Sequence, residues 1–222
     1  MSIRSNRIPK VKANNYRSNI GNDAASLWRA YDPSKPRSFV RGREQMHVSI
    51  LSICSSLGRL ASGIGSDILI KRLHASRIWC LTTSASLFAL AQLLALIITN
   101  PNYLFLVSSI TGLAYGALFG VFPSITADAF GVQGLSLNWG FVIFAPVLSG
   151  NVYNLCYGRI LDTNTGKAGE CQKGLGCYAS AYWVTLASSL AGAVLSVWCI
   201  RYEALARRKK AGMGKGVLAR ES

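Results

Sequence analysis

The sequence predicts an all-α membrane protein with five transmembrane helices. Residues 46–200 contain five apolar segments. Each is about long enough to cross a hydrocarbon core of ~30 Å, which needs roughly 20 helical residues. Because backbone groups in lipid must find hydrogen-bond partners within one element, each segment is expected to be a helix. The short alternating strands typical of a membrane barrel are missing from this pattern.

The distribution of charge supports membrane topology over nucleic-acid binding. The net charge of the 222-residue chain is +15. Residues 1–45 carry ten Lys or Arg and residues 201–222 carry seven, whereas the long middle is nearly free of charge. Basic ends around an apolar middle are typical of membrane proteins and suit contact with anionic lipid headgroups. We therefore expect the lipid bilayer, and no nucleic acid, as a partner.

The two ends of the chain are predicted to be tails. Residues 1–45 are rich in Asn, Ser, Arg, Lys and Pro, which predicts a basic, disordered N-terminal tail. No apolar stretch follows the first basic residues, so a cleavable signal peptide is not expected. Residues 201–222 are expected to form a basic cytoplasmic C-terminal tail. The five expected helices between the tails lie at residues 46–70, 78–98, 103–126, 139–161 and 179–200.

The first segment carries two motifs. Arg59 is expected well inside the membrane, where a charge is costly and faces a cavity or a partner. It could bind an anionic group of a substrate, or it could snorkel or bond neighbouring carbonyls, and both interpretations stay open. The second motif is a glycine-acid-basic signature at the cytoplasmic end, which we interpret as a gating latch. Its members are Gly63, Asp67, Lys71 and Arg72.

The third and fourth segments carry small and polar residues at helical spacing. Gly112, Gly116 and Gly120 form a stripe that predicts close helix packing, with Tyr115 beside it, and Pro123 is expected to bend or end this helix. In the fourth segment, cavity lining and interhelical hydrogen bonding remain alternatives for the asparagines. The residues on or beside its polar face are Gly150, Asn151, Asn154 and Gly158. The second and fifth segments lack charge and are expected to face lipid.

The loops set the expected orientation. Lys71, Arg72 and Arg77 between the first two segments, and Arg201 after the last, place the C-terminus in the cytoplasm. Five spans would then leave the basic N-terminal tail outside, against the charge rule. We therefore expect that a preceding helix is missing from this chain.

The cysteines and histidines predict neither an enzyme nor a metal site. Cys171 and Cys177 lie in an exoplasmic loop and are candidates for a disulfide. His47 and His74 are isolated, and no Cys/His cluster has the spacing of metal ligands. Paired acids and a nucleophile with a nearby base are also missing, so neither catalytic residues nor a cofactor are expected.

Together these stretches resemble the C-terminal half of a major facilitator superfamily transporter, in the fungal monocarboxylate-transporter-homologue and nodulin-like branch. The matching stretches are 58–67, 112–116, 123–131, 138–158 and 171–178. The resemblance implies a partial major facilitator fold, with helices eight to twelve of the family. It also implies that Arg59 binds a carboxylate. Ser55 stands where these transporters usually have an acid, so a coupled proton is left open.

The resemblance implies transport of a small solute, with carboxylates as the anionic candidates, by alternating access. Because one incomplete half cannot alternate alone, the chain is expected to be a truncated fragment that needs the N-terminal half or another membrane chain. The alternative is a non-transporting multi-pass scaffold or assembly partner. The expected substrate-binding residues are Arg59, Tyr115, Asn151 and Asn154. The vacuolar membrane is favoured over the plasma membrane.

Overall fold

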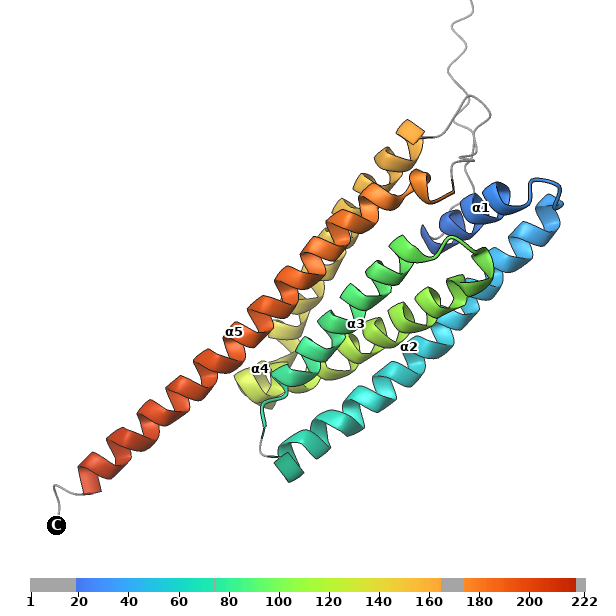
Figure 1. Cartoon of the computed structure of the whole chain (residues 1–222). Helices are drawn as coiled ribbons and strands as arrows, with labels where there is room; N and C mark the ends of the chain where they lie inside the picture. The colour runs from blue at the N-terminus through green and yellow to red at the C-terminus, as the bar shows by residue number, and fades with distance from the viewer. Residues whose placement is uncertain (1–18, 74, 165–173, 219–222) are drawn as a thin grey trace, which may run out of the picture.

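The computed structural model describes residues 19–73, 75–164 and 174–218, and these residues are almost entirely helical. Its helices are α1 (Asn19–Tyr31), α2 (Arg37–Leu73), α3 (Ile78–Ile97), η1 (Pro101–Tyr103), α4 (Leu104–Asn164), η2 (Gly174–Cys177) and α5 (Ala179–Leu218). The long helices run side by side as a bundle (Figure 1). At one end, which we call the α1 end, lie α1, η1 and η2. At the other, the Arg77 end, α2 is followed by α3.

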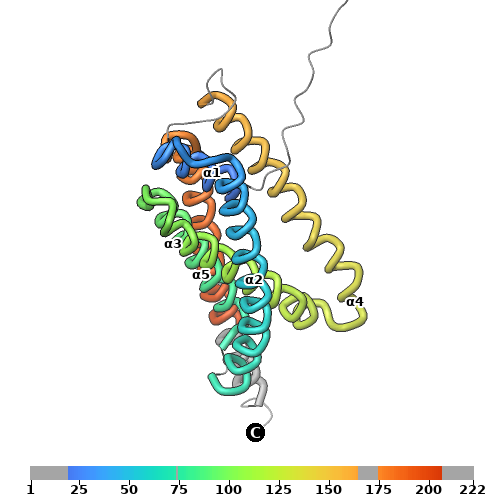
Figure 2. The backbone as a smooth tube through the Cα atoms, turned by 90° about the vertical axis from the view of Figure 1, so that its right-hand side faces the viewer, coloured from blue at the N-terminus to red at the C-terminus, as the bar shows by residue number. Residues whose placement is uncertain are grey.

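Helix α4 makes two traverses of the bundle because it bends at Gly131. This glycine has φ 73° and ψ 166°, whereas its neighbours are helical. A positive φ is open to glycine at little cost but strained for other residues. The limbs are residues 104–130 and 132–164, and the second leans away from α2 (Figure 2). The third segment does not end at Pro123, one of the two outcomes expected there, because the helix continues through this proline and breaks at Gly131.

Counting the two limbs of α4, the described chain crosses the bundle five times, as the five apolar segments predict. Four of its helices are long and apolar enough to span a membrane, with the range Pro101–Asn164 counted as one. Large apolar side chains are exposed along all of them. Examples are Ile53, Leu60, Ile97, Phe141, Val194 and Trp198. An exposed apolar surface of this extent suits lipid, and the chain is an integral, multi-pass, all-α membrane protein.

Helix α1 is the part of the fold that the sequence does not predict. Disorder was expected through residue 45, but Asn19–Tyr31 is helical and α2 already begins at Arg37. Ala24, Leu27 and Trp28 are buried, at the spacing of one helical face. The Trp28 ring packs edge-on against Phe39 with centroids 5.1 Å apart. Burial of this apolar face offsets the conformational entropy that is lost when a segment of polar overall composition becomes ordered.

The buried core is concentrated at the α1 end. It joins α1 to the end of α3, to both limbs of α4 and to the start of α5. Its members are Ala24, Leu27, Ala95, Leu104, Val107, Tyr157, Cys177, Tyr178 and Ala181. Helix α1 therefore covers one end of the bundle and fixes the positions of the helices beneath it.

Candidate functional site

A cavity of about 290 Å³ lies inside the bundle, next to α1. Its walls come from α3, from both limbs of α4 and from α5, while Leu51 of α2 and Ile20 of α1 complete it. The polar side chains in its lining are Gln92, Thr111, Tyr153, Tyr157, Tyr182 and Thr185. A mostly apolar cavity with a few convergent polar groups is the usual form of a small-molecule site.

The polar lining also connects neighbouring helices. The Thr185 hydroxyl of α5 donates to Oε1 of Gln92 on α3 at 3.0 Å. The Tyr153 hydroxyl of α4 donates to Oγ of Ser188 at 2.6 Å. Hydrogen bonds of this kind contribute about 1 kcal/mol between helices in a membrane. The cavity wall is therefore held together by the same groups that a solute could contact.

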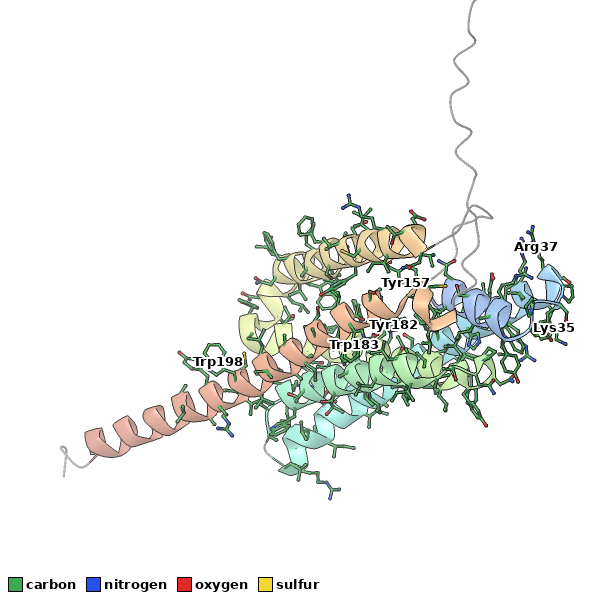
Figure 3. All side chains as sticks on the ribbon, turned by 45° about the horizontal axis from the view of Figure 1, so that its top comes forward. Lys35, Arg37, Tyr157, Tyr182, Trp183 and Trp198 are labelled. Atoms are coloured by element: carbon green, nitrogen blue, oxygen red, sulfur yellow. The ribbon has the colours of Figure 1, made fainter. Side chains whose placement is uncertain are left out.

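A buried carboxylate lies beside the cavity, on α1. Asp23 has no exposed surface, and its Oδ1 accepts a hydrogen bond of 2.6 Å from the Tyr157 hydroxyl. Its Oδ2 accepts one of 2.5 Å from the Tyr182 hydroxyl. The Tyr178 ring packs against Tyr182 with centroids 5.3 Å apart. We call these four residues the Asp23 cluster, and in Figure 3 its members Tyr157 and Tyr182 lie near α1.

The Asp23 cluster changes the acidity of its carboxyl group. Helix α1 is too short to span a bilayer and lies outside the spanning segments. Burial raises the pKa of Asp23 from 3.8 to about 7, although the hydrogen bonds from Tyr157 and Tyr182 lower it. Desolvation disfavours the charged form of an acid, and two neutral donors offset only part of that cost. The carboxyl group of Asp23 is therefore a much weaker acid than that of a free aspartate.

The Arg77 end is closed by an ion-pair cluster, the Arg77 clasp, formed by Ser66, Asp67, Arg77 and Asp128. Arg77 donates from Nη1 to Asp67 at 2.9 Å and from Nε to Asp128 at 2.8 Å. It also donates to Oγ of Ser66 at 2.9 Å. Burial alone would lower the pKa of Arg77, but the bonds to Asp67 and Asp128 raise it. One guanidinium thus connects α2, the start of α3 and the first limb of α4.

Helix α2 and the first limb of α4 approach closely through a glycine stripe. A Cβ on Gly112 would lie 2.6 Å from the carbonyl oxygen of Leu51, and one on Gly116 would collide with the carbonyl oxygen of Ser55. A Cβ on Gly120 would likewise lie 2.8 Å from the carbonyl oxygen of Arg59 on α2. Any larger residue would force these backbones apart, so the stripe sets the distance between two walls of the bundle.

The sequence is similar to those of several fungal membrane proteins. It is 36% identical to an uncharacterized membrane protein of Saccharomyces cerevisiae over 64% of this chain and 28% of the relative. It is 29% identical to the probable transporter mch1 of Neurospora crassa over 68% of this chain and 30% of the relative. For the probable transporter MCH1 of Saccharomyces cerevisiae the identity is 27%, over 67% and 31%.

This similarity fits the C-terminal part of a fungal MCH1-type major facilitator transporter. The aligned part spans about a third of the length of these relatives. No family model matches the chain, and no solved structure does so either.

The structure places the predicted substrate-binding residues outside the cavity. Arg59, Tyr115, Asn151 and Asn154 are all exposed, and none of them lines the cavity. Tyr115 packs on Phe119 with ring centroids 4.7 Å apart. The Asn151 amide donates to the carbonyl oxygen of Val147 at 2.8 Å, within its own helix. The structure does not bring these four residues together into one site.

The latch predicted at Gly63, Asp67, Lys71 and Arg72 has a different cation in the structure. Asp67 pairs with Arg77, whereas Lys71 and Arg72 have exposed side chains. A Cβ added to Gly63, Gly150 or Gly158 would meet no atom of a neighbouring element within 4 Å. In the described chain, no other helix therefore packs closely on these glycines. Cys177 is disulfide-bonded, while Cys171, its predicted partner, lies outside the described residues.

Several functional candidates were missed by sequence reasoning. Asp23 lies in a segment expected to be disordered, and its partners Tyr157 and Tyr182 are 134 and 159 residues away. Gln92 and Thr185 lie on α3 and α5, the two helices expected to face lipid, yet both line the cavity. A signal was present for Asp23, because it shares a helical face with Ile20, Ala24 and Leu27.

Proposed function

We propose that the chain forms part of a membrane carrier that moves a small polar solute by alternating access. The observation that carries this proposal is the cavity beneath α1, which residues of α2, α3, α4 and α5 line and which contains uncharged hydrogen-bonding groups. The names of the relatives, probable transporters, point in the same direction. In carriers of this type the solute site lies between helices that rock against each other.

The two ends of the bundle fit the roles of two gates. At the Arg77 end, the clasp connects three helices through side chains of which both acids are more than half exposed. Partly exposed ion pairs are weak, on the order of 1 kcal/mol, and can break at little cost. We propose that this end faces the cytoplasm and opens when the clasp separates, while α1 closes the opposite side.

For the solute we propose a small carboxylate that meets two sets of groups. Arg59, on the exposed side of α2, would attract the anion, with Tyr115, Asn151 and Asn154 as further proposed contacts. The cavity would then hold the solute by hydrogen bonds from Gln92, Thr185 and the tyrosine hydroxyls. The lining contains no basic side chain, so a carboxylate would enter it more readily together with a proton.

Uptake by proteoliposomes tests the proposal. The chain, alone and together with the remainder of a full-length relative, is reconstituted and supplied with radiolabelled short-chain monocarboxylates. Thr185→Val removes a cavity hydroxyl and should reduce uptake at least about threefold, in line with the loss of one hydrogen bond. Thr83→Val is the matched control, because Thr83 is exposed and its hydroxyl donates to the Trp79 carbonyl of its own helix.

The same experiment decides between transport and the alternative. Arg59→Ala should raise the KM for an anionic solute, and equal uptake by this variant would remove Arg59 from the mechanism. Uptake no faster than that of empty liposomes, with every solute and in both preparations, would favour a non-transporting scaffold. The second limb of α4 offers such a scaffold a surface, since its Val132 and Phe141 are 83% and 74% exposed.

A further inference from the structure

Within the part of the chain that the structure describes, Asp23 is a buried acid without a cationic partner. Among the described residues its bonds come from two phenol groups, Tyr157 on α4 and Tyr182 on α5. Tyr178, which precedes α5, is the third phenol nearby. No lysine, arginine or histidine in the described chain bonds Asp23. A buried carboxylate normally has a cation or several donors, and one without a cation tends to bind a proton.

The other elements that pack on α1 present their charges elsewhere. From α2, the guanidinium of Arg43 lies 5.7 Å from the ring centroid of Trp28, against the aromatic side of α1. His47 bonds Oγ of Ser108 at 3.0 Å, and Glu44 is buried. From η1, Tyr103 is 57% exposed. Among the described residues, burial and the phenols of Tyr157 and Tyr182 therefore set the electrostatic environment of Asp23.

The groups that hold Asp23 are also walls of the cavity. Tyr157 and Tyr182 line it, and so does Ile20, which lies one helical turn before Asp23 on α1. A neutral carboxylic acid can keep a hydrogen bond with both phenols, because it offers one donor and further acceptor sites. A charged carboxylate in the same place is costly, because its charge is not solvated by water. Undocking of α1 would return that charge to solvent and would uncover the cavity.

We propose that Asp23 is a proton-binding site of this protein, and that its protonation fastens α1 over the cavity while its deprotonation releases α1. The consequence for solute is occlusion: a solute in the cavity is enclosed from the α1 end when Asp23 carries a proton. This consequence rests on the proposed transport function, whereas the proton-dependent docking of α1 does not.

Hydrogen exchange of the α1 amides tests the docking directly. The full chain is placed in phosphatidylcholine nanodiscs, and exchange of residues 19–31 is measured by mass spectrometry at pH 5 and pH 8. Rates are corrected for the intrinsic pH dependence of exchange. With pKa values of 3.8 for the free acid and about 7 for the docked one, protection of α1 should fall roughly a hundredfold between these pH values. Equal protection at both would overturn the proposal.

Two variants assign the effect to one carboxyl group. Asp23→Asn is neutral at every pH, and its α1 should be equally protected at pH 5 and pH 8. Asp32→Asn is the matched control on the α1–α2 turn. Because the bonds from Ser34 lower the pKa of Asp32, this acid titrates below the tested window, and the variant should behave like the wild-type chain. An Asp23→Asn chain that keeps the wild-type pH response would overturn the proposal.

A third variant keeps the test decisive if Asp23→Asn does not fold. Tyr182→Phe keeps the ring but removes one donor to Asp23, so the charged form becomes costlier and the fall in protection should exceed that of the wild-type chain. A Tyr182→Phe chain with a pH-independent α1 would contradict a proton site at Asp23. Failed solute uptake together with pH-dependent docking would count against transport alone.

Discussion

Asp23 shows how one buried side chain can determine the behaviour of a whole helix. Its carboxyl group is enclosed because α1 brings Ala24, Leu27 and Trp28 into the core on the same face. The apolar contacts favour docking at every pH, whereas the carboxyl group favours it only when protonated. At low pH the apolar contacts and the carboxyl group both favour docking of α1. At high pH the apolar contacts still favour docking, whereas the charged carboxylate opposes it.

The first prediction concerns stability against pH. The folded pKa of Asp23 is raised above the unfolded value, so its contribution is fully present below pH 3.8 and is lost as pH rises through about 7. Thermal unfolding in detergent should show a loss of about 2 to 3 kcal/mol between pH 5 and pH 8 from this group. Asp23→Asn should abolish that loss. A pH slope identical in the variant would show that other groups cause it.

At the residue scale, the sequence predicts some of these side chains but not their partners. The sequence predicts a gating latch that contains Asp67, Lys71 and Arg72, and it predicts for Arg77 only a position in a cytoplasmic loop. Spacing along a helix favours Lys71, four residues after Asp67. The structure favours Arg77, because the turn before α3 places it between α2 and α4. Only the fold supplies that proximity.

At the scale of elements, the glycine stripe determines how α2 meets α4. The second prediction compares two glycines of α4. Gly116→Ala places a Cβ against the backbone of Ser55 and should destabilise the protein by about 1 to 3 kcal/mol. Gly150→Ala meets no atom within 4 Å and should be neutral or slightly stabilising, since alanine favours a helix. Melting temperatures of the two variants in one detergent provide the measurement.

If the Gly116→Ala variant melts with the wild-type chain, α2 and α4 must be able to separate at this point without loss of stability. Equal destabilisation by Gly150→Ala would instead indicate that the second limb of α4 packs tightly in the assembled protein.

The third prediction concerns the Arg77 clasp. Arg77→Gln removes both ion pairs and should reduce stability by only about 1 kcal/mol, because Asp67 and Asp128 are more than half exposed. Its larger effect should be local, as faster hydrogen exchange in residues 64–80. Arg72→Gln is the control on the same turn. A larger loss of stability or of exchange protection in Arg72→Gln than in Arg77→Gln would instead support the latch that the sequence predicts.

The elements themselves were mostly predictable, and α1 was the exception. Segments of roughly 20 apolar residues are determined by the thickness of the bilayer, which the sequence reflects directly. Helix α1 depends instead on a short amphipathic pattern within a polar stretch, whose order comes from contacts with residues more than a hundred positions away. Disorder was the natural expectation from composition, and tertiary burial overrode it.

For the whole molecule, both ends of the bundle carry basic residues, so charge alone gives a weak orientation. The Arg77 end has Lys71, Arg72 and Arg77, while the α1 end has Lys35 and Arg37 (Figure 3). At the α1 end, Lys35 also pairs with Asp32 at 3.6 Å and lies 5.7 Å from the Phe39 ring.

The fourth prediction is the orientation itself. Cysteines introduced as Ser34→Cys and Lys71→Cys lie at opposite ends of the bundle and are exposed. In sealed vesicles with the cytoplasmic face inside, an impermeant maleimide should label Ser34→Cys and should not reach Lys71→Cys until the vesicles are opened. The wild-type chain corrects for its own thiols, such as exposed Cys156 and Cys199. The reverse pattern would invert the proposed topology.

The bend at Gly131 has a consequence for the path of the whole chain. As one straight rod, the 61 residues of α4 would reach about 90 Å, roughly three bilayer thicknesses. The φ and ψ angles of one residue without a side chain send the second half back across the lipid. The direction of everything after it, including the cavity wall from Tyr153 to Ile160 and all of α5, depends on this hinge rather than on a loop.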